Sequence, residues 1–303
     1  MERLRPSLLA NGRVTWFERD STSRERGLDG TTWGPQLGAD FRLSERAFVG
    51  GLFTYERTDS TFDSDQPGRN FTPPKNDGDT EANGYGLTFF GSYDFDEHWY
   101  VDGSFGGAYT DYTFTRRAVF QETTRTIPQT NVRGREDTDG WEINGSAGAG
   151  YRWGWEALSL SPYLRLAVVH ARVDSYEEDD ETGSGLAMEI DDTDQTSFTS
   201  VLGLRASYAW STAWGVLVPQ ARAEWEHEYA RDAEEIDTRY VLDPAGNDFP
   251  VRGDSPDRNY ANLGASLLLV LPNGWMPFVD YEALVGHSFY DRHRLTFGLR
   301  AEF

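Results

Sequence analysis

The residues best suited to hydrolytic chemistry are an adjacent histidine and serine, His287 and Ser288. A serine becomes a nucleophile when a histidine within hydrogen-bond reach takes its proton. Neighbouring side chains in a strand point to opposite faces, so this pair could act together only if it lay in a turn. We therefore expect no catalytic residues and no enzyme activity, and keep a hydrolase (a lipase or a protease) as the alternative.

A second candidate for chemistry is an acidic stretch that could bind Ca²⁺ through carboxylate oxygens. Its acidic residues are Glu177, Glu178, Asp179, Asp180, Glu181, Glu189, Asp191, Asp192 and Asp194. The stretch lacks the residue order and the required glycine of an EF-hand loop. Charge runs of this kind usually form solvated loops, so we expect no metal site, although divalent ions could bridge the loop to anionic lipopolysaccharide.

The composition excludes several other kinds of function. Cysteine is absent, which rules out disulfides and Cys-ligated metals. The net charge of -22 argues against nucleic-acid partners. The mean hydropathy is -0.62, and no apolar run approaches the roughly 18 residues of a membrane helix. The glycine-rich run 145–150 lies inside a strand pattern with no following helix, so it is not a phosphate loop, and we expect no cofactor.

The elements that must position these residues are strands, and the last one, 293–303, shows the pattern most clearly. Its apolar residues Leu295, Phe297, Leu299 and Phe303 share one parity, while polar residues occupy the other. This period of two predicts a strand with one apolar and one polar face. Its length matches the roughly 9–11 residues that a tilted strand needs to cross a bilayer. The terminal aromatic ring is typical of the girdle of a membrane barrel.

The same alternation predicts twelve strands along the chain. They are residues 8–18, 35–43, 47–57, 83–95, 99–116, 141–153, 158–176, 197–210, 215–229, 260–271, 275–285 and 293–303. Short connections alternate with long polar ones, and we expect long loops at 59–82, 117–138, 177–195 and 231–258. This rhythm predicts a single transmembrane antiparallel up-and-down β-barrel with short periplasmic turns and long extracellular loops. A soluble sandwich should instead have a polar outer face.

The polar parity of the strands predicts the lining of the barrel. The lumen-facing residues are Asp40, Asp94, Asp102, Glu142, Arg152, Arg165, Arg205, Arg222, Glu224, Glu226, Asp280, Glu282, Arg300 and Glu302. These side chains could simply pair across strands in a hydrated lumen. They could also form a polar conduit for a polypeptide, and the sequence alone does not separate the two roles.

Several segments resemble the autotransporter β-domain of type V secretion. The segment 274–283, followed by 295–303 with its terminal Phe303, is similar to the end of that domain. The segments 85–87 and 99–102 are similar to its middle strands, and 249–253 also fits. The resemblance covers residues 8–303 and leaves residues 1–7 as a residual linker. It implies a twelve-stranded barrel that anchors and exports an N-terminal passenger across the bacterial outer membrane.

The resemblance also implies partners. These are outer-membrane lipid and lipopolysaccharide, the barrel-assembly machinery, and the protein's own N-terminal passenger with its linker helix, neither of which we expect within residues 1–7. The family's assembly signal maps onto Leu295, Phe297, Leu299 and Phe303, and we expect Tyr290 to belong to the same face. We expect a monomer. A barrel hydrolase and a passive, porin-like barrel stay open as alternatives.

Overall fold

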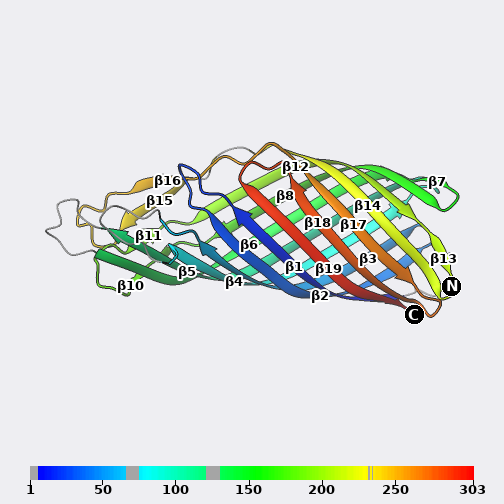
Figure 1. The fold of residues 1–303 in the computed structure, drawn as a ribbon, viewed down its shortest axis with the longest axis horizontal. Helices are drawn as coiled ribbons and strands as arrows, with labels where there is room; N and C mark the ends of the chain where they lie inside the picture. The colour runs from blue at the N-terminus through cyan, green and yellow to red at the C-terminus, as the bar shows by residue number, and fades with distance from the viewer. Residues whose placement is uncertain (1–5, 66–74, 121–129, 231–232, 234) are drawn as a thin grey trace.

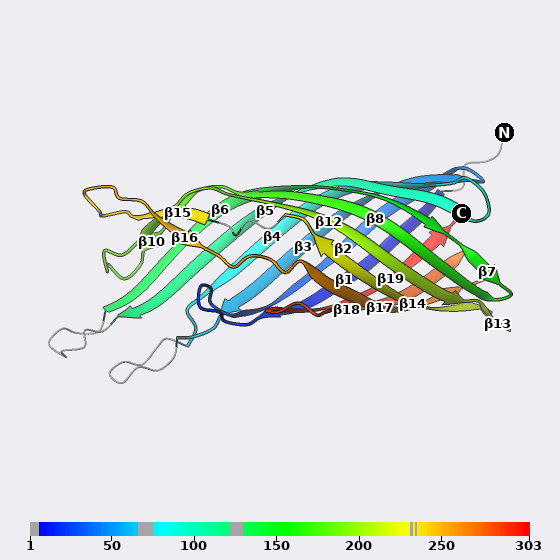
Figure 2. The ribbon, with the colours of Figure 1, turned by 90° about the horizontal axis from the view of Figure 1, so that it is seen from above.

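The computed structural model describes residues 6–65, 75–120, 130–230, 233 and 235–303, and these form an all-β structure. Figures 1 and 2 show an elongated barrel whose strands run obliquely to its long axis. None of the described residues belongs to a helix that is long and apolar enough to cross a membrane. The alternating sequence pattern, which favours half-buried strands, is found in the long strands that build this structure.

Twelve long strands build the wall. They are β1 (Pro6–Arg19), β2 (Leu28–Ser44), β3 (Ala47–Phe62), β4 (Gly78–Asp94), β5 (Trp99–Phe120), β6 (Thr130–Tyr151), β8 (Leu158–Val173), β12 (Thr193–Tyr208), β14 (Gly215–Glu228), β17 (Asn259–Val270), β18 (Trp275–Val285) and β19 (Tyr290–Glu302). Each pairs antiparallel with its neighbours in chain order, and β1 pairs with β19 from Ser7↔Glu302 to Arg19↔Tyr290. The predicted closed up-and-down barrel is therefore confirmed, and closure leaves no strand edge in the wall.

Seven short strands lie at the two ends of the barrel (Figure 1). Near the termini are β7 (Trp153–Trp155) and β13 (Trp210–Thr212). At the opposite end are β9 (Tyr176–Glu177), β10 (Asp179–Asp180), β11 (Met188–Ile190), β15 (Glu235–Tyr240) and β16 (Phe249–Arg252). Of these, β16, β15, β11 and β9 form a separate sheet, which we call the cap sheet.

The wall is one strand thick, and its two faces have opposite chemistry. On β12, Phe198, Leu202 and Leu204 are exposed on the outside, while Thr199 and Val201, of the other parity, are buried. Across the described chain, many of the buried side chains are polar, and many large apolar side chains are exposed. This inside-out distribution is what a membrane barrel requires, because lipid replaces water around its outer face.

The strands at the far end from the termini are longer than predicted. β5 and β6 have 22 residues each, about twice the 9–11 residues that cross a bilayer. The prediction of one loop over 117–138 is wrong at both ends, because residues 117–120 and 130–138 continue the β5–β6 ladder. Residues 59–62 and 78–82 likewise extend β3 and β4. Outside lipid a strand needs no apolar face, so the sequence of these extensions does not alternate between apolar and polar residues.

The other two predicted loops also contain ordered pairing. The segment 177–195 holds β10, β11 and the start of β12, and 231–258 holds β15 and β16. β10 pairs with β6 through Asp179↔Arg135, and β11 pairs with β15. The extracellular connections are therefore long, as predicted, but in their described parts they fold against the barrel rim.

Candidate functional site

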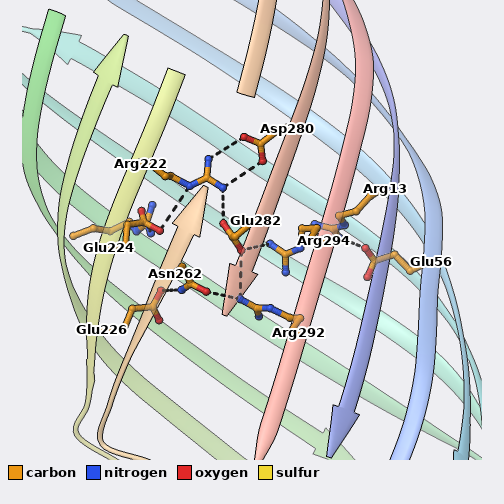
Figure 3. A network of polar contacts seen from close by, with 11 residues as sticks. Arg13, Glu56, Arg222, Glu224, Glu226, Asn262, Asp280, Glu282, Arg292 and Arg294 are labelled. Atoms are coloured by element: carbon orange, nitrogen blue, oxygen red, sulfur yellow. Dashed lines mark hydrogen bonds and ion pairs between the residues drawn. The ribbon is translucent and has the colours of Figure 1, made fainter. Parts of the chain in front are cut away.

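The most connected group of polar side chains in the lumen is centred on Glu282 of β18 (Figure 3). Its buried carboxylate accepts a hydrogen bond from Arg222 of β14 at 2.5 Å. Arg292 and Arg294 of β19 each donate to its other oxygen at 3.4 Å. Arg222 also lies 3.2 Å from Asp280. One carboxylate is thus shared by three guanidinium groups, which ties β14, β18 and β19 together.

Glycines allow these long side chains to lie along the wall. Arg222 reaches β18 by crossing β17 at Gly264, where an added Cβ would come within 2.9 Å of Arg222 Cγ. Tyr163 of β8 crosses β12 over Gly203 in the same way and donates to Glu224 of β14 at 2.5 Å. Close approach of a side chain to a strand is one reason for glycine within a sheet. At these two places polar contacts therefore link a strand to its second neighbour while following the wall.

The network continues towards the seam between β19 and β1. Asn262 of β17 donates to Glu226 and accepts from Arg292 at 3.1 Å. Arg13 of β1 forms an ion pair with Glu56 of β3, on the far side of β2. These residues come from strands that are neighbours around the barrel, so the network covers one side of the lumen (Figure 3).

A second group holds the seam near the termini. Arg300 of β19 donates to Ser7 of β1 at 3.0 Å and to Asp40 of β2 at 2.8 Å. Glu302 lies 3.5 Å from Arg300. Ser7 is almost completely buried. This contact spans the closing pair of strands and joins the first two strands of the chain to the last.

A third group lines a cavity of about 310 Å³ near the short turns. Arg165 donates to Glu224 at 3.1 Å. Arg205 lies over the ring of Tyr163, 5.7 Å from its centroid, and makes no ion pair with any described residue. Asp102 also lines this cavity.

The remaining predicted lumen residues make local contacts. Arg152 donates to Asp94 at 2.7 Å and lies over the Tyr100 ring, 4.3 Å from its centroid. Glu142 accepts from Asn144, its neighbour on β6, at 2.8 Å. The structure therefore divides the fourteen predicted side chains among several groups and does not bring them into one site.

Several members of the Glu282 network were missing from the predicted set. They are Arg13, Glu56, Asn262, Arg292 and Arg294. Parity alone would have found the two on β19, because Arg292 and Arg294 share the even parity of Arg300. Their contacts with β14 and β17 depend on the register of the closed barrel, which has no local sequence signal.

The candidate hydrolytic pair lies in the turn between β18 and β19, so the argument from opposite strand faces does not apply to it. The backbone N–H of Ser288 donates to the carboxylate of Asp257, and His287 Nδ1 lies 3.5 Å from the same carboxylate. Burial lowers the pKa of His287, although the charge of Asp257 opposes that shift. Within the described residues Ser288 makes no hydrogen bond to His287, so the pair lacks the contact that activates a nucleophile.

The acidic stretch serves the fold of its own loop. Asp180 accepts the backbone N–H of Gly185 at 2.6 Å and the hydroxyl of Ser184 at 3.2 Å. These hydrogen bonds, the Gly185 N–H foremost, lower the pKa of Asp180 to about 2. Buried Glu178 binds Arg116 through two hydrogen bonds, at 2.7 and 2.5 Å. No group of three or more acidic or histidine residues in the described chain could hold a metal ion.

The proposed assembly-signal residues lie on the outer face of the last strand. Phe297 and the terminal Phe303 are exposed, whereas Leu295 and Leu299 are half-buried. The backbone N–H of Phe303 donates to the carbonyl of Pro6 at 3.2 Å. The C-terminal residue is therefore attached to the first strand while its ring is left free outside.

The expectation that Tyr290 shares this face is wrong. Tyr290 has the parity of Arg292, which lies in the lumen network. Its ring lies 6.3 Å from that of Phe17 and 5.9 Å from that of His287. The odd parity of Leu295 and the even parity of Tyr290 place the two side chains on opposite faces.

Comparison with known protein families agrees with this architecture. The Autotransporter beta-domain family matches residues 8–282. The chain belongs to the autotransporter β-domain family. It is therefore a translocator barrel, and membership implies a location in the bacterial outer membrane.

Solved structures of autotransporter barrels share the fold. The translocator domain of the autotransporter NalP from Neisseria meningitidis superposes with a TM-score of 0.72 at 15% identity, over 99% of this chain and 88% of that one. The beta domain of the Bordetella autotransporter BrkA gives a TM-score of 0.65 at 18% identity, over 99% and 100%. At these identities the likeness establishes the barrel alone.

Two named relatives are much longer than this chain. An extracellular serine protease of Serratia marcescens is 26% identical over 224 residues, which are 72% of this chain and 19% of that protein. The esterase EstA of Pseudomonas aeruginosa is 26% identical over 259 residues, 82% of this chain and 35% of that protein. The chain therefore spans only about a fifth to a third of their length.

Proposed function

We propose that this barrel carries an N-terminal passenger through the bacterial outer membrane and anchors it at the cell surface, without chemistry of its own. The observation that carries the proposal is a closed barrel of the translocator family whose lumen is lined by charged side chains held along the wall. A polar, hydrated lining lets a polypeptide pass without exposing its backbone groups to lipid.

The hydrolase names of the relatives do not make this barrel an enzyme. This chain corresponds to 19% of the protease and 35% of the esterase, so we assign those activities to the remaining parts of the relatives. The contacts of Ser288 with Asp257, described above, agree with that assignment. The passenger and its substrate in this protein are therefore independent of the barrel.

We assign to the barrel the partners that its family implies. Lipid and lipopolysaccharide surround its apolar outer face. The barrel-assembly machinery binds the last strand at Leu295, Phe297, Leu299 and Phe303. The passenger and its linker helix enter the lumen. We also propose that the barrel works as a monomer; pairing of β1 with β19 closes it without a strand from a second copy.

Surface display tests the proposed function. A secretion signal, an epitope-tagged passenger and a linker are placed ahead of residue 8, and intact cells are probed with antibody and with added protease. We expect the tag to be labelled and then removed, while the barrel resists the protease. The matched control lacks residues 290–303, so it cannot close and should display nothing. A barrel that inserts and conducts ions but leaves its tag inside would instead indicate a porin-like protein.

A further inference from the structure

Three arginines from the two strands of the closing seam form a cluster, here called the arginine triad. Its members are Arg13 of β1 and Arg292 and Arg294 of β19. In the β1–β19 ladder, Thr15 lies opposite Arg294 and Phe17 lies opposite Arg292, so the three arginines have the same inward parity. Figure 3 shows their side chains gathered on one side of the lumen, next to Glu282.

The acids around the triad neutralise it incompletely. Arg13 has its own partner, Glu56. Arg292 and Arg294 share a single oxygen of Glu282, at 3.4 Å each. The shortest contact of Glu282, at 2.5 Å, goes to Arg222 instead. The two arginines of β19 therefore have only long contacts to a carboxylate that is already engaged elsewhere.

Hydrogen-bond donors without an acceptor also show that Arg292 and Arg294 lack partners. The Nε atoms of both Arg292 and Arg294 are buried and find no acceptor within the described residues. A buried donor without an acceptor is destabilising, and native proteins usually supply a partner. The rest of each side chain is still open to the lumen, since Arg292 is 26% and Arg294 is 30% exposed, so a carboxylate arriving there could accept charge-assisted N–H bonds from the two guanidinium groups.

We propose that the arginine triad binds the carboxylate of an acidic side chain on the polypeptide segment that occupies the lumen. This inference rests on the proposed translocator function and adds the chemistry by which the lumen holds its occupant. The triad lies on the inner parity of the wall, away from lipid headgroups, so the carboxylate comes from a chain inside the barrel. Arg205 offers a single cation over a tyrosine ring and lacks the paired donors.

The test uses the folded 303-residue barrel in planar bilayers and measures how long a peptide blocks its current. Three synthetic peptides of about 20 residues, long enough to span a bilayer as a helix, differ only in one central residue, Glu, Gln or Lys. We expect the Glu peptide to reside about tenfold longer than the Gln peptide, because a charge-assisted bond is stronger than a neutral one. The Lys peptide should leave fastest.

Two sets of variants locate the effect. Arg294→Gln and, separately, Arg292→Gln should reduce the residence of the Glu peptide to that of the Gln peptide. Glu282→Gln should lengthen it, because it removes the competing carboxylate. The matched control Arg205→Gln, in the same lumen, should leave the ratio of Glu-peptide to Gln-peptide residence unchanged. Each variant is compared only if its conductance without peptide equals that of the parent barrel.

Several results would overturn the inference. Equal residence of the Glu and Gln peptides on the parent barrel would do so without any variant. Loss of the preference in Arg205→Gln but not in Arg294→Gln would move the site elsewhere. Competition by free glutamate at the peptide's concentration would show a general site for small anions. In each case normal surface display of a tagged passenger would leave the translocator function intact, so the two failures are distinguishable.

Discussion

Strand β6 has one half in the membrane-crossing wall and one half at the extracellular end, and the two halves expose different kinds of side chain. Residues 141–151 alternate, with exposed Trp141 and Ile143 on the outside and small or polar residues on the inside. Residues 130–140 lack an exposed apolar face: the exposed side chains are charged, as at Arg133, Arg135 and Asp137, while Val132 is buried where the extracellular segments fold against the rim. Both halves keep the same ladder with β5.

This difference separates two sources of order. In the membrane-crossing wall, lipid favours apolar side chains on the outer face, and ion pairs such as Arg222–Glu282 stabilise polar side chains on the inner face. At the extracellular end, water replaces lipid around the strands, and order comes from a few specific contacts such as Arg116–Glu178. Substitutions should therefore act globally in the wall and locally at the extracellular end.

The largest difference is expected for an arginine placed on an exposed leucine in each region. Leu204→Arg, on the outer face of β12, should lower the free energy of unfolding by about 2–4 kcal/mol near the midplane of the bilayer. Leu242→Arg, next to β15 of the cap sheet, should change it by less than about 0.5 kcal/mol, although Leu242 is the more exposed of the two at 71% against 48%. Reversible unfolding in lipid measures both.

The control for this comparison lies on the same strand. Ser207→Arg faces the lumen and should be far better tolerated than Leu204→Arg. If the lumen variant proved the more damaging, the assignment of faces would be reversed.

A smaller contrast is expected for two buried glutamates. Glu282→Gln removes the shared counter-charge of Arg292 and Arg294 and should destabilise the whole barrel by about 1–3 kcal/mol. Glu178→Gln weakens the contact with Arg116 and should leave global unfolding unchanged.

The expected effect of Glu178→Gln is local opening. Its carboxylate accepts the backbone N–H of Met188, so hydrogen exchange at that amide should accelerate. Exchange at Thr296, in the wall, serves as the reference. Equal acceleration at both amides would show that the extracellular end and the wall open together, which would contradict separate sources of order in the two regions.

The wall could be predicted from the sequence because lipid requires apolar residues at every second position of a membrane-crossing strand. All twelve long strands, their antiparallel order and the closure between the ends follow from alternation and from the lengths of the connections. The same rule places Arg222, Glu282 and Arg300 on the inner parity, where they form ion pairs.

Other parts of the structure could not be predicted from the local sequence pattern. The extensions of β5 and β6 carry no apolar outer face, since they lie beyond the membrane-crossing part of the wall and their exposed side chains there are mostly polar. The contact between Arg222 and Glu282 depends on Gly264 in an intervening strand, and so on the register of three strands. The lack of partners for Arg292 and Arg294 can be recognised only when the shared carboxylate and its distances are known.

Acid should loosen the acidic loop before the wall. Hydrogen bonds to the ionised Asp180 hold its pKa at about 2, below the ordinary 3.8, so the folded loop favours the charged form. The stability that ionised Asp180 gives to the loop is present above about pH 3.8 and is lost as the pH falls towards 2. Amide exchange at Gly185, followed against pH, should rise in that window.

The matched variant for the pH prediction is Asp180→Asn. It cannot titrate, so the rise in Gly185 exchange between pH 3.8 and 2 should disappear. Opening near pH 6 in the parent protein would instead point to a histidine and contradict the role given to Asp180.

The smallest effect on stability is expected at the terminal ring. Deleting Phe303 should change unfolding in lipid by no more than about 0.5 kcal/mol, because the ring is 68% exposed. Insertion in cells, followed by pulse labelling, should nevertheless slow if the residue is recognised by the assembly machinery. Trp275→Ala, which removes an exposed ring near the same end, is the control and should not slow insertion. A normal insertion rate without Phe303 would leave it as a girdle ring only.

The central claim is that the passenger travels along the inner face of this wall. Thr296 and Phe297 are consecutive in β19, and Thr296 lies opposite Asp280 while the ring of Phe297 is exposed outside. A photoactivatable amino acid at each position, with a passenger arrested during export, tests the claim directly. We predict a covalent adduct with the passenger from position 296 and adducts with lipid alone from position 297. Passenger adducts at 297, or at neither position, would contradict the account.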